Sequence, residues 1–506
     1  MCPLKILPIE QIRELDAFTI LNEPVKSIDL MERAAFECYS WINEKVHDIS
    51  SFKIVCGMGN NGGDGLAIAR MLHKDGHNVE VLYIRHTSEA SQDNKINFKK
   101  VAEIEGLVVT EIFEEDSEIE FQEEEIIIDA ILGSGLNKQV SGLIAEIIKQ
   151  INESRGFVIS IDIPSGLFAD KPLPDAKTTP IVNADYTLTF QMPKLAFFIP
   201  ENDKYVGKWE ILPIGLDEGF IKSSRSNYFV TIDEDCRFIY KPRKRFSHKG
   251  SFGHALLIAG SLGKIGASIL AAKSCLKAGA GLTTAHIPIC GMEPMHISVP
   301  EVMVDIDDSE THISSLPELD RYNAIAIGPG LGLHEESVNA LKLLIQEVKK
   351  PLILDADALN ILSENKTWLS FLPPDSILTP HPKEFERLTS PVANHFNRLD
   401  ILRAFAIRYK INVILKGAYS AIALSDGNIY FNPTGNPGMA TGGTGDVLTG
   451  ILLGLKASGY SARETCILGT WLHGKAADLA VKKTSEPSLV ASDIIKYLGK
   501  AFLKLQ

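Results

Sequence analysis

Residues 53–65 read KIVCGMGNNGGDG, an apolar strand-like run that ends in a glycine-rich turn, and residues 66–74 follow with helical spacing. Further strand-like runs occur in the first half of the chain at 78–84, 126–129, 157–162 and 186–190. Strands that alternate with helices predict parallel βαβ units, and runs rich in Val and Ile predict strands covered on both faces. The first half is therefore expected to form an α/β domain around a parallel sheet.

The alternation breaks between about 217 and 250 and then restarts. Strand-like runs in the second half occur at 255–259, 324–327, 352–355, 377–378 and 413–415. We therefore predict two α/β domains, 1–225 and 226–506. The basic run KPRKR at 241–245 is interpreted as a domain junction or as the rim of an anion site.

The composition excludes several classes of protein. The chain has 506 residues, of which 45% are hydrophobic and 23% charged, as in ordinary globular proteins. A net charge of −13 opposes binding to nucleic acid or to an anionic membrane, so neither is an expected partner. The acidic run at 111–125 is interpreted as a solvated loop or helix face.

Cysteine usage and the amino terminus predict the compartment. Seven cysteines without CxxC spacing argue against a disulfide framework and against a zinc ribbon. The chain begins MCPLKI, which does not read as a signal peptide, and no run reaches the length of a membrane span. We expect a cytoplasmic protein.

Three glycines in the opening stretch, Gly57, Gly59 and Gly62, satisfy the pattern G-x-G-x-x-G. Glycines let the backbone turn tightly and bring its N–H groups against a phosphate at a helix start. The strand at 78–84 is followed by Arg85 rather than by the acidic residue that binds a ribose, which argues against an ordinary NAD dehydrogenase. A purely structural turn is the alternative.

Two aspartates end strands in the same half and precede glycine turns. Asp129 is followed by residues 133–136, GSGL, and Asp162 begins residues 162–166, DIPSG. Because the carboxyl ends of parallel strands meet at one edge of a sheet, both aspartates are expected to share a cleft with the glycine turn. Such carboxylates serve as acids or bases or bind a cation, although a lone aspartate here more commonly caps a helix.

Residues 60–65 (NNGGDG), 162–166 (DIPSG) and 30–34 (LMERA) resemble the NAD(P)H-hydrate epimerase domain, over about residues 1–220. The resemblance implies a Rossmann-like three-layer sandwich that interconverts the R and S hydrates of NADH and NADPH. It implies K⁺ binding by Asn61, Asp129 and Ser165, and we choose Asp162 as the acid/base. Ser134 stands where the family usually has threonine, which preserves a hydroxyl. The implied substrate-binding residues are Asn60, Asn61, Gly62, Gly63, Asp64, Gly133, Ser134, Gly135, Leu136, Asn137, Lys138, Gln139 and Asp162.

Residues 436–446, NPGMATGGTGD, run directly into an apolar helix at about 447–456. Successive backbone N–H groups at a helix start suit a transferring phosphoryl group, and Asp446 in the first turn could accept a proton from the attacking hydroxyl. No Lys-Ser/Thr pair follows, so this is not a Walker A loop. An aspartate cap behind a flexible loop is the alternative.

Two shorter motifs follow other strands of the second half. Residues 416–420, KGAYS, could carry a nucleotide phosphate or base edge, although alone they read as an ordinary turn. His381 stands between two prolines and is expected in an extended loop. A lone histidine is more often structural than catalytic, but this one shares the strand edge with the other loops.

Together with residues 328–332 (GPGLG) and 355–360 (DADALN), these motifs resemble the ribokinase-like ADP/ATP-dependent NAD(P)H-hydrate dehydratase, from about residue 230 to the end. Lys383 and the pair Ser274-Cys275 depart from the family pattern without falling on an implied ligand. The resemblance implies Mg²⁺ and a nucleotide co-substrate, with Asp446 as the base. The implied contacts to the hydrated cofactor are Ala267, Gly330, His381 and Asp446, and those to the nucleotide are Lys416, Gly417, Ala418, Tyr419, Ser420 and Gly445.

The predicted function is repair of damaged coenzyme: epimerisation of NAD(P)H hydrates, then nucleotide-dependent dehydration of the S hydrate. ADP is favoured over ATP, because the resemblance links this domain fusion to prokaryotes. A homo-oligomer with small-molecule partners is expected. One alternative is a ribokinase-like kinase that releases a phosphorylated product. Another is a binding module with a degenerate nucleotide-binding half, which the aspartates in the polar loops disfavour.

Overall fold

The computed structural model describes residues 3–46, 50–113, 118–173 and 178–506. The chain divides into two compact units, Lys5–Ser226 and Asn227–Gln506, and Leu4 groups with the second of them. The predicted boundary after residue 225 lies one residue before this division. The basic run 241–245 falls inside the C-terminal unit and not at the division, so its interpretation as a domain junction is wrong.

The N-terminal unit is built on a seven-stranded sheet with the order β4-β3-β2-β5-β6-β7-β8. All its neighbouring strands run parallel, with Val55 opposite Asp129 and Asp129 opposite Ser160. The strands are β2 (Ser51–Cys56), β3 (Asn78–Ile84), β4 (Val108–Ile112), β5 (Ile126–Ala130), β6 (Phe157–Ile161), β7 (Tyr186–Phe190) and β8 (Lys208–Leu212).

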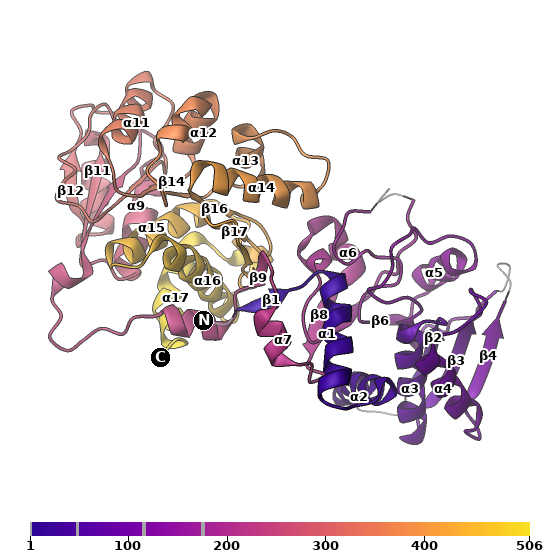
Figure 1. The fold of residues 1–506 in the computed structure, drawn as a ribbon. Helices are drawn as coiled ribbons and strands as arrows, with labels where there is room; N and C mark the ends of the chain where they lie inside the picture. Colours follow the sequence, from indigo (N-terminus) through magenta and orange to yellow (C-terminus); the bar gives the residue numbers. More distant parts are fainter. Residues whose placement is uncertain (1–2, 47–49, 114–117, 174–177) are drawn as a thin grey trace. The chain divides into compact units, whose positions relative to one another are not determined.

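Helices cover both faces of this sheet and give three layers (Figure 1). Side chains of α2, α3 and α4 form one apolar core with strand residues such as Ile54, and α5 forms a second with strand residues such as Val55. The α/β class predicted for this half is therefore confirmed. The helices are α1 (Ile9–Asn22), α2 (Ser27–Lys45), α3 (Asn60–Lys74), α4 (Gln92–Ala102), α5 (Leu143–Glu153), α6 (Asp203–Val206) and α7 (Glu218–Ser223).

Helix α3 begins at Asn60, six residues before the start expected at 66. Glycine is a poor helix former, so the sequence pattern favoured a loop here. Packing overrides that preference: a Cβ on Gly62 would lie 1.8 Å from the carbonyl oxygen of Gly57, and one on Gly65 would lie 2.6 Å from Ala130. The glycines therefore allow the first turns of α3 to rest directly on the strand ends.

The acidic run at 111–125 is not one solvated face. Residues 114–117 lie outside the described residues. Glu111 belongs to β4, and Glu125 is buried with its carboxylate 3.4 Å from the ammonium of Lys53, which is itself buried. The interpretation is therefore wrong at Glu125, where the charge is paired inside the unit.

The C-terminal unit contains the strand order β9-β18-β17-β16-β15-β14-β13-β10-β11-β12. Its strands are parallel from β12 to β16, and β17 is antiparallel to both β16 and β18. The α/β class predicted for this half is confirmed as well. The strands are β9 (Tyr228–Val230), β10 (His254–Ile258), β11 (Leu282–Ile287), β12 (Met303–Ile306), β13 (Ala324–Ile327), β14 (Leu352–Leu354), β15 (Ile377–Leu378), β16 (Asn412–Leu415), β17 (Ala421–Ala423) and β18 (Ile429–Phe431).

The core of this unit lies around α15, which packs closely against α9 (Figure 1). A Cβ on Gly450 would lie 2.0 Å from the carbonyl oxygen of Ala271, and one on Gly454 would lie 2.4 Å from that of Cys275. The two glycines thus let the helix backbones meet. The helices are α8 (Asp233–Ile239), α9 (Ile265–Lys277), α10 (Met292–Ser298), α11 (Glu335–Glu347), α12 (Asp357–Glu364), α13 (Pro382–Leu388), α14 (His395–Tyr409), α15 (Thr444–Ala457), α16 (Ala462–Val481) and α17 (Ala491–Leu503). Among the described residues, no helix combines the length and apolarity that a membrane crossing requires.

Candidate active sites

Asp129 organises the first site, at the carboxyl ends of the strands in the N-terminal unit. Its buried carboxylate accepts hydrogen bonds from the Ser160 hydroxyl at 2.7 Å, from the Ser165 backbone N–H at 2.8 Å and from the Ser165 hydroxyl. Burial raises the pKa of Asp129 above its ordinary value, and these hydrogen bonds offset part of the rise. Asp129 and Ser165, predicted as ligands of one cation, are therefore in direct contact.

Asn61, the third predicted cation ligand, lies in the first turn of α3. Its side-chain oxygen and nitrogen are buried, and neither has a hydrogen-bond partner within the described part of the chain. A Cβ on Gly133 would lie 3.2 Å from the Asn61 side chain, and the neighbouring Leu132 N–H donates to the Ser165 hydroxyl at 2.8 Å. An unpartnered buried amide oxygen beside a carboxylate and a hydroxyl fits a cation that takes oxygen ligands.

Asp162 follows β6 in a left-handed conformation, with φ of +67°, which is unusual for a residue other than glycine. One carboxylate oxygen lies 2.6 Å from the ammonium of the buried Lys194, and the other accepts a hydrogen bond from the Ser134 N–H at 3.2 Å. Burial alone would raise the pKa of Asp162, but Lys194 and Ser134 outweigh it and hold the pKa below its ordinary value. Asp162 is thus an ionised carboxylate inside the site.

Two further carboxyl groups of the N-terminal unit have the opposite tendency. Burial and the charge of Asp162 raise the pKa of Asp16, on α1, to about 6. Burial, together with Asp162 and Asp16, raises the pKa of Asp64 well above its ordinary range. Carboxyl groups whose environments push their pKa values apart are suited to opposite roles as proton donor and acceptor.

The sequence motifs did not reveal Lys194 or Asp16. Lys194 follows β7 and also donates a hydrogen bond to the Thr189 hydroxyl at 2.8 Å, and Asp16 comes from a helix far upstream. A lysine in an otherwise apolar segment, residues 192–199, was the available signal, because a fully buried lysine requires a partner.

The remaining predicted substrate-binding residues lie around this centre in two groups. Gly62, Gly63 and Asp64 are buried in the first turns of α3, whereas Asn60 is exposed beside them. In the loop after β5, Gly133, Ser134 and Leu136 are half-buried, and Gly135 accepts a hydrogen bond from the Arg13 guanidinium at 3.1 Å. Asn137, Lys138 and Gln139 are exposed at the far end of that loop.

The second site, in the C-terminal unit, is centred on an ion pair between Lys416 and Asp355. Their nitrogen and oxygen atoms lie 2.9 Å apart, and the Thr449 hydroxyl donates to the other oxygen of Asp355 at 2.7 Å. Burial would raise the pKa of Asp355, but Lys416 and Thr449 lower it below its ordinary value. Burial would likewise lower the pKa of Lys416, and Asp355 and Glu384 raise it instead. Both groups therefore stay charged.

Asp446 lies in the first turn of α15, as predicted, and is half-buried. Burial and the charge of Asp355 raise the pKa of Asp446 to about 6, although Lys416 lowers it in part. A Cβ on the preceding Gly445 would lie 3.4 Å from the Lys416 ammonium, so the start of α15 is within contact of the ion pair. A carboxylate with a pKa near the working pH is a suitable proton acceptor.

A cavity of about 550 Å³ opens beside these residues. This size lies within the usual range for sites that hold small molecules and cofactors. His473 lines it, and burial lowers the pKa of that imidazole to about 4, so the wall is neutral there. All six predicted nucleotide-binding residues line the cavity: Lys416, Gly417, Ala418, Tyr419, Ser420 and Gly445.

Two predicted contacts to the hydrated cofactor lie together. Gly330 has φ of +62°, and a Cβ there would lie 2.7 Å from the carbonyl oxygen of Lys264 and 3.2 Å from the Cβ of Ala267. Only glycine therefore allows the loop after β13 to approach the start of α9 so closely.

His381 has an extended backbone, as predicted, with φ of −80° and ψ of 166°, and it also caps α13, which begins at Pro382. Its Nδ1 accepts hydrogen bonds from the N–H groups of Lys383 at 3.1 Å and Glu384 at 3.3 Å. Proline fits the first turn of a helix, which explains why α13 begins directly after His381. Burial and nearby Lys416 lower the pKa of His381, although Glu384 opposes them, and the neutral imidazole keeps its Nε2 proton to donate.

Two family models match this chain. The model described as YjeF-related protein N-terminus matches residues 27–196, and the model described as NAD(P)H-hydrate dehydratase matches residues 255–500. Each match falls within one of the two units, and together they agree with the predicted Rossmann-like and ribokinase-like α/β folds.

Curated relatives match over nearly the whole chain. A bifunctional NAD(P)H-hydrate repair enzyme of Moorella thermoacetica is 34% identical, covering 98% of this chain and 96% of the relative. Proteins with the same description in Thermofilum pendens and Escherichia coli are 32% and 31% identical, covering 99% and 93% of this chain and 97% and 89% of their own lengths. A solved ADP/ATP-dependent NAD(P)H-hydrate dehydratase from Bacillus subtilis, co-crystallised with ATP and Mg²⁺, is 30% identical with a TM-score of 0.49, covering 55% of this chain and 98% of that one.

Proposed function

Because this chain belongs to the family of bifunctional NAD(P)H-hydrate repair enzymes, we propose that its two units act in sequence on damaged coenzyme. The N-terminal unit interconverts the R and S hydrates of NADH and NADPH. The C-terminal unit dehydrates the S hydrate at the expense of ADP and regenerates the dihydronicotinamide. The fusion supplies the dehydratase with the epimer that it accepts.

The dehydration must overcome a poor leaving group. The hydroxyl oxygen of the S hydrate attacks the β-phosphorus of ADP, its proton passes to Asp446, and AMP departs. The C–O bond to the new phosphate then breaks as the ring nitrogen shares its electron pair, and loss of a proton from the adjacent carbon restores the dihydronicotinamide. One hydrate and one ADP thus yield one NAD(P)H, one AMP and one inorganic phosphate.

The observation that carries this proposal is the placement of Asp446 beside the nucleotide-sized cavity. Gly445 and Lys416 line that cavity, and Asp446 follows Gly445 in the same helical turn. The N–H groups at the start of α15 suit the transferring phosphoryl group, and the Lys416 ammonium adds positive charge. Mg²⁺ bound to the nucleotide phosphates would neutralise part of the charge that develops during transfer.

For the epimerase, we assign the proton acceptor to the ionised Asp162 and the proton donor to Asp16 or Asp64. The donor protonates the departing hydroxyl, which leaves as water while the ring nitrogen stabilises the carbon. Water then adds to the opposite face and gives up a proton to Asp162. Support comes from the low pKa of Asp162 and the raised pKa values of Asp16 and Asp64.

Asn61, Asp129 and Ser165 would hold a potassium ion in this site. The buried, unpartnered Asn61 amide supports that assignment. The ion would supply fixed positive charge for the anionic dinucleotide. A homo-oligomer, a cytoplasmic location and a preference for ADP over ATP are further proposals from the family resemblance.

The assay that tests the function supplies the protein with an R/S mixture of hydrated NADH and either ADP or ATP. Repair predicts recovery of the near-ultraviolet absorbance of NADH together with equal amounts of AMP and inorganic phosphate when ADP is used. The alternative, a ribokinase-like kinase, predicts a stable phosphorylated product without recovered NADH. That outcome would refute the dehydratase assignment.

A further inference from the structure

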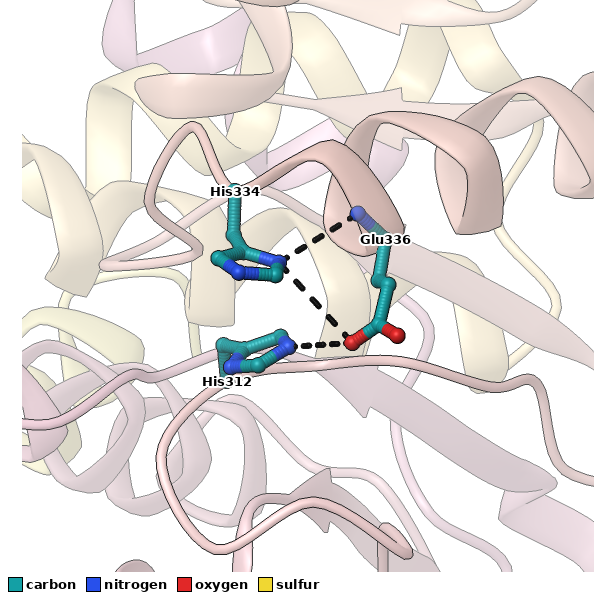
Figure 2. Close-up of side chains that lie close together, drawn as sticks. All are labelled: His312, His334 and Glu336. Carbon is teal, nitrogen blue, oxygen red and sulfur yellow. Dashed lines mark hydrogen bonds and ion pairs between the residues drawn. The ribbon is translucent and has the colours of Figure 1, made fainter.

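His312, His334 and Glu336 bring three metal-ligand atoms together in the C-terminal unit (Figure 2). Their side-chain donor atoms all lie within 4.8 Å of one another, and this is the one such group of three among the described residues. His312 comes from the loop after β12, whereas His334 precedes α11 and Glu336 lies in its first turn. The nitrogen and oxygen donors thus converge from two separate segments.

The distances between these donor atoms are close to those between the ligand atoms of a bound metal ion. Nε2 of His312 lies 2.6 Å from a carboxylate oxygen of Glu336, and Nδ1 of His334 lies 3.8 Å from the same oxygen. Ligands at about 2.0–2.1 Å from a tetrahedral metal lie about 3.4 Å from one another. Movements of about an ångström in the exposed side chains would therefore place all three donors around one ion.

Neighbouring groups hold His312 in position. The hydroxyls of Ser309 and Thr311 lie 3.2 and 3.0 Å from its Nδ1, which leaves Nε2 to face Glu336. Asp307 accepts hydrogen bonds from the N–H groups of Ser309, Ser314 and Ser315 and so fixes both ends of the loop. Ligating histidines are usually oriented in this way through their other ring nitrogen.

The two rings and the carboxylate of the cluster suit a cation. The two imidazole rings lie with their centroids 3.7 Å apart and are tilted by 31°, so a nitrogen of each ring is close enough to share one ion. The His334 Nδ1 accepts the Glu336 backbone N–H at 3.4 Å, a long hydrogen bond that an ion would replace. A shared metal ion would use one lone pair of each ring, and the Glu336 carboxylate would balance part of its charge.

The cluster is also accessible. Side-chain exposure is 53% at His334 and 56% at Glu336, against 16% at His312. An ion can therefore enter from solvent, and a water molecule can complete the coordination. Two imidazoles with one carboxylate suit Zn²⁺, Co²⁺ or Ni²⁺, whereas Mg²⁺ prefers oxygen ligands alone.

We propose that His312, His334 and Glu336 bind one divalent transition-metal ion of the zinc class. The bound ion joins the loop after β12 to the start of α11. The carbonyl of Thr311 accepts a hydrogen bond from the Leu262 N–H at 2.7 Å, and the Gly332 N–H donates to Asp357 at 2.8 Å. The ion would therefore brace the loops around Gly330, beside the C-terminal site, without taking part in its chemistry.

The test is a Co²⁺ and Zn²⁺ titration of the full chain after dialysis against chelator. Visible absorption of bound Co²⁺ reports nitrogen and oxygen ligands, and calorimetry with Zn²⁺ reports stoichiometry and affinity. We expect one site, with binding at least ten times weaker in His334→Gln and in Glu336→Gln. His296→Gln, a change at an exposed histidine on α10, is the matched control and should bind normally.

His334 and Glu336 are both exposed, so their variants keep the fold, and thermal unfolding without metal checks this. In the wild type, Zn²⁺ should raise the unfolding temperature of the chain, and this rise should be absent in both variants. Failure of the wild type to bind Co²⁺ or Zn²⁺ would overturn the proposal. Binding that is equally strong in His334→Gln would overturn it as well.

Discussion

Replacing Asp446 with asparagine should stabilise the C-terminal unit and abolish its activity at the same time. The substitution keeps the size of the side chain and removes only its ability to ionise. Burial and Asp355 raise the pKa of Asp446 from 3.8 to about 6. Raising a pKa by about 2 costs about 1.4 kcal/mol for each tenfold change in the ionisation constant, which with a discount for partial exposure gives about 2–3 kcal/mol.

The sign of this effect follows from proton linkage. Because the pKa is raised in the folded state, the folded chain binds the proton more tightly, and ionised Asp446 costs stability above about pH 6. The cost disappears as the pH falls towards about 4. The free energy of unfolding of Asp446→Asn should therefore exceed that of the wild type by about 2–3 kcal/mol near pH 8 and by almost nothing near pH 4.

Activity should move in the opposite direction. Loss of a general base lowers a rate by about 10²- to 10⁴-fold, so Asp446→Asn should lose dehydration to that extent while epimerisation continues. In the wild type, dehydration should fall about tenfold per pH unit below the Asp446 pKa of about 6, because only the ionised carboxylate accepts the proton.

Two assays check this prediction. Denaturant unfolding at several pH values gives the stability difference, and the rate of NADH recovery from the S hydrate with ADP gives the activity. Dehydration within threefold of the wild type would refute the role of Asp446 as the proton acceptor. A variant no more stable than the wild type near pH 8 would refute the raised pKa of Asp446.

Three further substitutions test the two sites. Lys194→Met leaves Asp162 buried without the ammonium that pairs with it, which should cost about 3–5 kcal/mol of stability and raise the pKa of Asp162. The pH profile of residual epimerisation should therefore move to higher pH, and an unmoved profile would contradict this. Gly445→Ala places a Cβ 3.4 Å from the Lys416 ammonium and should raise the KM for ADP by about tenfold. Gly442→Ala is the control, because a Cβ there meets nothing within 4 Å, and it should leave the KM unchanged. Equal KM values in both variants would argue against a nucleotide at the start of α15. Asn61→Ala should weaken K⁺ binding, so the K⁺ concentration that gives half-maximal epimerisation should rise about tenfold. An unaltered potassium titration would remove Asn61 from the cation site.

Local sequence pattern was sufficient for the strands that position the sites. The bounds expected for β3 and β7 agree with the structure, since runs of β-branched residues with turn signals at both ends predict buried parallel strands. Asp129 and Asp162 could be placed at one sheet edge because the carboxyl ends of parallel strands meet there. The early start of α3 could not be predicted from the sequence, because it depends on how Gly62 and Gly65 pack against the sheet, which is a tertiary effect.

Functional residues that belong to no sequence motif could not be predicted from the sequence pattern. Lys194 and Asp16 approach Asp162 only after β7 and α1 take their places in the fold. His312 and Glu336 are 24 residues apart, a spacing that matches no familiar metal motif. In each case the chemistry depends on a distance that the chain order does not encode locally.

The central claim is that this one chain completes the repair of both epimers, and the most direct measurement uses pure R hydrate. Supplied with R-hydrated NADH and ADP, the wild type should recover NADH faster than the R hydrate epimerises spontaneously, with one AMP and one inorganic phosphate per NADH. Recovery no faster than spontaneous epimerisation, or accumulation of a phosphorylated hydrate, would contradict the account.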